Sequence, residues 1–116
     1  MNYKEFLKTK EIESINSGFK VSPDKLNPML FPFQRDIVKW AIQKGKAAIF
    51  SDCGTGKTMM QLEFAHQVVK KTGGNALVVA PLSVVNQTKK EGQKFGIAVN
   101  VCRTHRDVKD GINITN

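Results

Sequence analysis

Along the chain, short apolar runs alternate with stretches in which apolar residues recur at helical spacing. Continuous apolar runs at residues 47–50 and 76–80 predict strands that are buried on both faces. Between them, residues 57–71 predict a helix that Gly73 and Gly74 end, with a wide apolar face suited to covering a sheet. That face consists of Met60, Leu62, Phe64, Ala65, Val68 and Val69.

The alternation continues towards the C-terminus. Ser83 is a candidate N-cap for a helix that runs to Phe95. Residues 97–101 alternate apolar and less apolar positions and predict a third strand, and residues 112–115 predict a fourth. Strands that alternate with helices are typical of βαβ units on a parallel sheet, so the predicted fold class is α/β with flanking helices.

The first third of the chain has a different pattern. Residues 3–17 predict an amphipathic helix that Gly18 ends, and the three prolines of residues 19–32 predict a turn-rich linker. From Phe33, apolar positions on one face predict another helix that stops at Gly45. We therefore divide the chain into residues 1–29, an N-terminal helical appendage and linker, and residues 30–116, the main domain.

Composition narrows the class of protein. The 116 residues are 41% hydrophobic and 24% charged, as in ordinary globular proteins, and their number suits one domain. No apolar run approaches the roughly 18 residues that span a membrane, and the N-terminus has no signal-peptide pattern. These features predict a cytoplasmic protein without a membrane partner.

Charge and metal-binding residue types add little. The net charge of +8 suits a polyanionic partner, but it is spread evenly over both halves of the chain and is weak evidence for nucleic acid. Cys53 and Cys102 have no spacing typical of zinc sites or disulfides and are expected to be reduced thiols. His66 and His105 have no partner spacing and are expected at the surface.

The most informative segment is residues 51–58, Ser-Asp-Cys-Gly-Thr-Gly-Lys-Thr, between a predicted strand and a predicted helix. Such a loop directs backbone N–H groups and a helix N-terminus at a phosphate, and glycines at 54 and 56 permit positive φ and close approach. Lys57 would reach the β- and γ-phosphates, and the Thr58 hydroxyl would bind Mg²⁺. Ser51 stands where the full motif has its first glycine, and a plain glycine-rich turn is the alternative. The expected nucleotide contacts here are Asp52, Cys53, Gly54, Thr55, Gly56, Lys57, Thr58 and Met59, with Lys57 and Thr58 as catalytic residues.

With these motifs in place, residues 30–95 resemble the first RecA-like domain of superfamily 2 helicases and translocases, closest to Swi/Snf-type and phage or prophage DEAD/DEAH-box-like ATPases. The resemblance implies a P-loop NTPase fold that binds ATP and Mg²⁺. Members of this group often replace the first glycine of the loop by a small residue, as Ser51 does here. Relative to that family the chain corresponds to an incomplete lobe.

Residues 30–34 resemble the family's Q-type motif. A glutamine amide both donates and accepts, as the edge of adenine requires, so Gln34 is the expected adenine contact. Phe31 stands where relatives often carry an arginine, and it would either stack on adenine or pack in the core. For Phe33 we expect core packing.

Residues 80–84 resemble motif Ia, which contacts the backbone of the tracked nucleic-acid strand in that family. The resemblance implies nucleic-acid contacts by Pro81, Leu82 and Ser83, with DNA favoured over RNA. The lysines at positions 89, 90 and 94 are expected to form a solvated face. Residues 111–116 resemble the opening of motif Ib.

The family's acidic pair, which holds Mg²⁺ and orients water, has no counterpart, because the sequence contains no Asp-Glu dipeptide. The resulting hypothesis is an ATP-binding N-terminal segment of an ATP-dependent DNA helicase or translocase, in which hydrolysis requires downstream motifs and a second RecA-like domain. A small stand-alone P-loop phosphotransferase or regulatory module is the alternative, although only Arg103 and Arg106 lie where its lid arginines would be. A decayed gene product without activity is a third reading.

Overall fold

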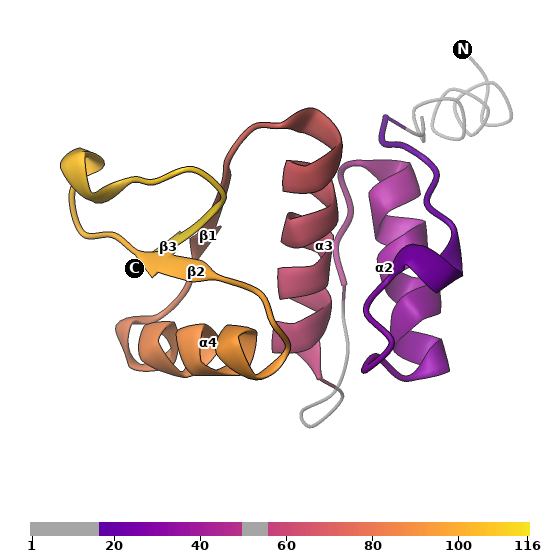
Figure 1. The fold of residues 1–116 in the computed structure, drawn as a ribbon, viewed down its shortest axis with the longest axis horizontal. Helices are drawn as coiled ribbons and strands as arrows, with labels where there is room; N and C mark the ends of the chain where they lie inside the picture. Colours follow the sequence, from indigo (N-terminus) through magenta and orange to yellow (C-terminus); the bar gives the residue numbers. More distant parts are fainter. Residues whose placement is uncertain (1–16, 50–55) are drawn as a thin grey trace, which may run out of the picture.

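The computed structural model describes residues 17–49 and 56–116 (Figure 1). Their helices are α2 (Pro32–Lys44), α3 (Lys57–Thr72) and α4 (Leu82–Lys94), with two 3₁₀ turns, η1 (Pro23–Lys25) and η2 (His105–Asp107). The strands are β1 (Ala76–Val79), β2 (Val99–Val101) and β3 (Ile112–Thr115). The helix predicted over residues 3–17 falls outside the described residues, apart from its last position.

The three strands form one parallel sheet in the order β1-β3-β2. Ile112 in the central strand pairs with Ala76 on one side and with Val99 on the other. Helix α4 connects β1 to β2 as the crossover of a βαβ unit, which parallel strands require. The α/β class, the parallel sheet and the flanking helices are thereby confirmed.

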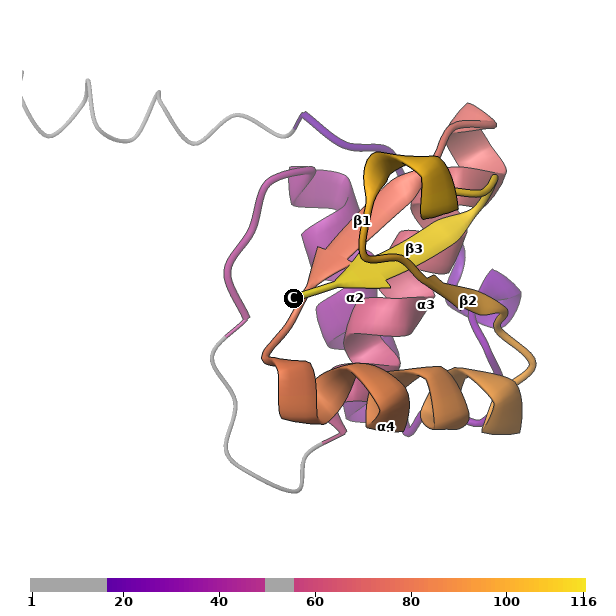
Figure 2. The same cartoon turned by 90° about the vertical axis from the view of Figure 1, so that its left-hand side faces the viewer.

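Helices cover one face of this sheet in the described part of the chain. Val78, Ile112 and Ile114 point to that face and belong to a core that α3 and α4 complete. Figure 2 shows the opposite face towards the viewer, with α3 and α2 behind the strands. Leu77 and Val79 lie on it with exposed fractions of 62% and 66%, so the prediction that residues 76–80 are buried on both faces is wrong here.

The first predicted strand is also wrong for the residues that the structure describes. Residues 47–49 belong to no strand, and Phe50 falls outside the described residues. A strand needs a hydrogen-bonding neighbour, and two alanines bury too little apolar surface to hold an unpaired segment. Ala47 and Ile49 instead line a cavity of about 380 Å³ together with Met60 and Phe64 of α3.

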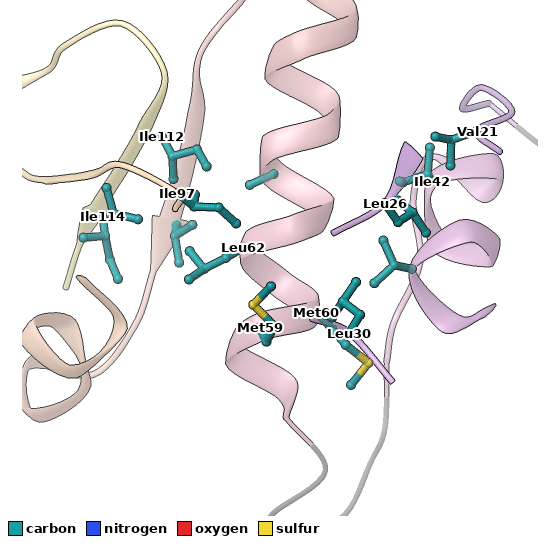
Figure 3. Close-up of a cluster of buried hydrophobic side chains, with 14 of the residues drawn as sticks. Val21, Leu26, Leu30, Ile42, Met59, Met60, Leu62, Ile97, Ile112 and Ile114 are labelled. Carbon is teal, nitrogen blue, oxygen red and sulfur yellow. The ribbon is translucent and has the colours of Figure 1, made fainter. Parts of the chain in front are cut away.

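Helix α3 is the middle layer of the molecule, between the sheet on one side and α2 with the linker on the other (Figures 1 and 3). Leu62 points to the sheet side and Met60 to the side of α2, where Leu30 of the linker also lies. Leu62, Met60 and Leu30 are each at most 2% exposed. Burying one such side chain contributes about 1.5–3 kcal/mol.

The helix ends follow from glycine and proline. Helix α2 starts at Pro32, one residue before the predicted start at Phe33, and stops as predicted at Gly45, whose φ is 79°. Helix α3 stops at Gly73. Helix α4 starts at Leu82 behind Pro81, so Ser83 lies inside the helix and the prediction that it is the N-cap is wrong. Proline at 81 has φ near −56°, which sets the chain direction for the helix without a side-chain cap.

Gly92 lies within α4, where a glycine lowers helix stability, and the segment between α4 and β2 explains why it is there. A Cβ on Gly92 would lie 2.7 Å from the carbonyl oxygen of Ile97. The N–H of Ile97 donates to the Gly92 carbonyl at 2.7 Å, which folds the chain back against the helix. Only glycine allows this approach, and that outweighs its lower helix propensity of about 1 kcal/mol.

A buried asparagine anchors the connection between β2 and β3. The Asn113 side chain is 2% exposed, and its oxygen accepts from the Asn100 amide and the Lys109 N–H, each at 3.0 Å. Its amide donates to the Lys109 carbonyl at 2.8 Å. The amide is thus hydrogen-bonded on both sides, as burial demands.

Asp107 stabilises the exposed end of the connection between β2 and β3. Its carboxylate accepts the backbone N–H groups of Arg103 at 3.0 Å and Thr104 at 3.1 Å. These hydrogen bonds favour the charged form and lower the pKa of Asp107 below its usual value. The turn therefore depends on an ionised carboxylate.

Residues 19–30 pack closely against the helices. Val21, Leu26 and Leu30 all belong to the hydrophobic core. The division of the chain at residue 29 stays a prediction, and two of these core residues lie on its N-terminal side. Within the described ranges, no helix has both the length and the apolar character to cross a membrane.

Candidate nucleotide-binding site

The phosphate-loop motif ends at the start of α3. Gly56 has φ 79° and ψ 37°, a left-handed conformation that glycine adopts without strain, and Lys57 is the first helical residue. Asp52, Cys53, Gly54 and Thr55 lie outside the described residues, so their phosphate contacts stay predictions. The structure thus shows the glycine-to-helix junction of the motif but not the loop before it.

The junction leaves backbone donors for an anion. The first hydrogen bond of α3 runs from the Met60 N–H to the Gly56 carbonyl at 3.1 Å, and no side chain caps this end. The N–H groups of residues 57–59 therefore precede the helix's own hydrogen bonding. Together with the positive end of the helix dipole they favour a phosphate.

The side chains at this junction differ in exposure. Lys57 is exposed and Thr58 is half-buried, so both reach the surface at the helix start. Met59 is 4% exposed and packs in the core, which leaves its backbone N–H as the group it can offer to a nucleotide. The ammonium and the hydroxyl are thus placed on the outside, beside the backbone donors.

Gln34 lies directly against this junction. A Cβ on Gly56 would be 2.1 Å from Gln34 Nε2, so the glutamine amide occupies the space that any other residue at 56 would fill. Gln34 is 5% exposed, and its Oε1 accepts the Phe31 N–H at 2.8 Å. The two segments singled out from the sequence, 22 positions apart, are brought into contact.

The aromatic residues beside Gln34 point outward. Phe31 is 65% exposed and Phe33 is 48% exposed, and their rings stack with centroids 6.2 Å apart. The prediction of core packing for Phe33 is therefore wrong, and of the two readings of Phe31 the structure excludes core packing. Leu30 takes the core position instead, at 2% exposure, and Pro32 then starts the helix with both rings on the outside.

Two features of this region escaped the sequence analysis. Arg35 Nε donates to the Leu30 carbonyl at 3.1 Å and thereby fixes the turn that presents Phe31. Glu63 of α3 is 1% exposed, and its Oε1 accepts the Asn27 N–H at 3.2 Å and Gln67 Nε2 at 2.8 Å. The sequence feature that could have indicated burial of Glu63 is its position between Leu62 and Phe64, on the apolar side of the helix.

That acidic side chain is part of a cluster that holds the linker in place. Asn27 also donates through Nδ2 to the Phe95 carbonyl at 3.1 Å. Glu63 Oε2 is buried and has no hydrogen-bond partner among the described residues. The linker that leads into Phe31 and Gln34 is thus bonded to both α3 and the end of α4.

The segment that resembles motif Ia lies at the start of α4. Pro81, Leu82 and Ser83 are all exposed. Figure 1 shows α4 and the start of α3 at the same lower end of the molecule. The N–H of Ala80 donates to the Thr115 carbonyl at 3.0 Å, which carries the sheet pairing up to this segment.

Metal-binding groups are sparse in the described ranges. No group of three or more His, Cys, Asp and Glu side chains there could hold a metal ion. Mg²⁺ in a nucleotide site needs only one or two protein oxygens besides the phosphates, and the role of the Thr58 hydroxyl as such a ligand stays a prediction. Cys102 is buried and unbridged, while His66 and His105 are exposed as expected.

Comparison with known families identifies the family of the chain. The family model of the type III restriction enzyme, res subunit, matches residues 4–112, nearly the whole chain. A search of curated proteins gave no match. The matched family has the RecA-like P-loop fold of superfamily 2 helicases, in agreement with the parallel sheet and the glycine-to-helix junction. The chain therefore belongs to the type III restriction enzyme res subunit family, in its superfamily 2 helicase-like ATPase domain.

Proposed function

We propose that this chain binds ATP with Mg²⁺ as the ATP-binding segment of an ATP-dependent DNA helicase or translocase. ATP hydrolysis then requires an acidic pair that these 116 residues do not contain. The observation that carries the proposal is the contact between Gln34 and Gly56 at the start of α3. It joins an adenine-reading side chain to a phosphate-binding helix start.

Each residue has a separate task in this proposal. Gly56 lets the backbone approach the phosphates, and the N–H groups of residues 57–59 donate to them. The Lys57 ammonium binds the β- and γ-phosphates, and the Thr58 hydroxyl is a ligand for Mg²⁺. When bound, the metal neutralises charge on the phosphate oxygens. The predicted contacts of residues 52–55 complete the cradle.

The adenine of ATP and the nucleic acid bind to neighbouring surfaces of the chain. The exposed Phe31 ring stacks on adenine, and Gln34 fixes the position of the base relative to the loop. Pro81, Leu82 and Ser83 contact backbone phosphates of the nucleic acid, with DNA preferred over RNA. We further propose a cytoplasmic location and a second RecA-like domain as the functional partner of this one.

Thermal unfolding with and without ATP and Mg²⁺ tests the proposal. Ligand at 100 times its Kd stabilises by about 2.7 kcal/mol, which raises the Tm of a domain this size by about 10 °C. Lys57→Ala is expected to remove the ATP-dependent shift and leave the Tm without ATP nearly unchanged, because Lys57 is exposed. Lys89→Ala, an exposed lysine of α4, is the matched control and should keep the shift. The proposal would be contradicted if the unsubstituted chain had the same Tm in saturating ATP and Mg²⁺ as it has without them.

A further inference from the structure

A second hollow lies away from the nucleotide site, between the linker and the C-terminal half of α3. Its volume is about 430 Å³, and its lining includes Lys20 and Lys25 of the linker and Lys70 and Lys71 of α3. No acidic side chain is among its lining residues. We call it the lysine groove. Because an α-helix rises 1.5 Å per residue, Lys70 is about 20 Å along α3 from Lys57.

Buried hydrogen bonds fix the two walls of the lysine groove. Gln67 is one of its lining residues and is 6% exposed. Its Nε2 donates to the Lys25 carbonyl at 3.2 Å and to Glu63 Oε1 at 2.8 Å. The backbone that carries Lys25 is thereby held at a set position against the helix, so the lysines of the two walls stay opposed.

An aromatic contact joins the walls near the end of α3. Lys71 Nζ lies 5.8 Å from the centroid of the Phe19 ring, within the range of a cation–π interaction. Asp24 of the linker and Glu63 line a neighbouring hollow, which Lys25 and Lys70 also border. The Asp24 carboxylate accepts the Ser22 hydroxyl. The positive charge of the lysine groove therefore has no carboxylate opposite it among its lining residues.

Four ammonium groups around one concavity favour an anion that carries several charges along its length. Lysine binds phosphate as a point charge and needs no fixed geometry at the partner. A concave groove of this size fits a strand backbone better than it fits a flat membrane surface. We propose that the lysine groove binds the phosphodiester backbone of nucleic acid at a site separate from residues 81–83. The choice of nucleic acid over other polyanions rests on the proposed function, while the groove itself does not involve ATP.

The test compares two lysine pairs on the full chain. Lys70→Gln with Lys71→Gln alters the groove, and Lys89→Gln with Lys90→Gln is the control, since it also removes two adjacent exposed lysines from a helix. Binding of a fluorescein-labelled DNA duplex is followed by anisotropy without nucleotide, at several salt concentrations. Each phosphate contact contributes about 0.9 to the slope of log K against log salt, so the groove pair should lose about 1.8 of slope and about tenfold in affinity. The control pair should keep the slope.

A third variant guards against a folding artefact, because Lys70 and Lys71 also complement the helix dipole. Lys20→Gln with Lys25→Gln alters the opposite wall and should give the same loss of slope, with the Tm of each variant measured alongside. Equal losses in the groove and control pairs, or no loss in either, would overturn the proposal. Stronger competition by polyglutamate than by unlabelled duplex would overturn it in favour of an acidic protein partner. Because the assay contains no ATP, a negative result would count against the lysine groove and not against nucleotide binding.

Discussion

Replacing Gly56 with alanine is expected to damage both the fold and the nucleotide site, and Gly73→Ala provides a matched control. Both glycines are left-handed, with φ of 79° and 69°. A Cβ at position 56 would lie 2.1 Å from Gln34 Nε2, whereas a Cβ at position 73 would meet nothing within 4 Å. The two substitutions therefore share a backbone cost and differ in a steric one.

The magnitudes follow from these contacts. Left-handed backbone costs alanine about 1–2 kcal/mol at either position. At position 56 the Cβ also displaces the Gln34 side chain, which is 5% exposed and whose Oε1 accepts the Phe31 N–H, and repacking this side chain costs about 2 kcal/mol more. Because the Tm changes by about 4 °C per kcal/mol of stability, the Tm of Gly56→Ala should lie about 8 °C below that of Gly73→Ala.

Thermal unfolding followed by circular dichroism measures this difference, and adding ATP and Mg²⁺ extends it to the site. Gly73→Ala should keep the ATP-dependent rise in Tm, while Gly56→Ala should lose it. Equal melting temperatures for the two variants would refute the packing of Gln34 on Gly56. Retention of the ATP shift by Gly56→Ala would refute the role of this junction in phosphate binding.

Three further changes probe the rest of the chain. Asn113→Ala should lower the free energy of unfolding by about 3 kcal/mol in a urea titration, because it removes three hydrogen bonds of a buried amide. Glu63→Ala should cost about 2 kcal/mol, with faster hydrogen exchange at the Asn27 amide that loses its acceptor. The pKa of Asp107 is lowered by backbone donors, so its stabilising effect is complete above the pKa of the unfolded chain and disappears as the pH falls through the folded pKa. Asp107→Asn should thus flatten the fall of Tm in acid.

Local patterns were sufficient for the three helices that the described residues form and for three of the four expected strands, while the helix expected over residues 3–17 stays a prediction. The period of apolar positions placed α2, α3 and α4 within a few residues, because each helix buries one continuous face. The strand expected over residues 47–50 was wrong for its described part, since pairing depends on a neighbour that no local pattern specifies. Phe33 was placed in the core for its hydrophobicity, although Leu30 already fills that position.

The candidate site was predictable where backbone chemistry decides it. A glycine before Lys-Thr implied the left-handed junction at Gly56, which the structure shows. The contacts that position the site were not predictable, because they join polar residues far apart in the chain. Glu63 and Gln67 are both buried and bind the linker, and no local pattern in the sequence identifies the linker as their partner.

The bonds of Asn27 bear on the order in which the chain folds as it is synthesised. Its two protein partners outside the linker, Glu63 and Phe95, follow it by 36 and 68 positions. Neither bond can form until those residues have left the ribosome, although the start of the linker can already bond to the end of α2 through the N–H groups of Gly18 and Phe19. Since doubling a loop adds only about 0.6 kcal/mol of closure entropy, the second contact forms with little extra cost once the first exists. Arrival of residue 95 thus completes the pair of bonds by which Asn27 joins the linker to α3 and to the end of α4.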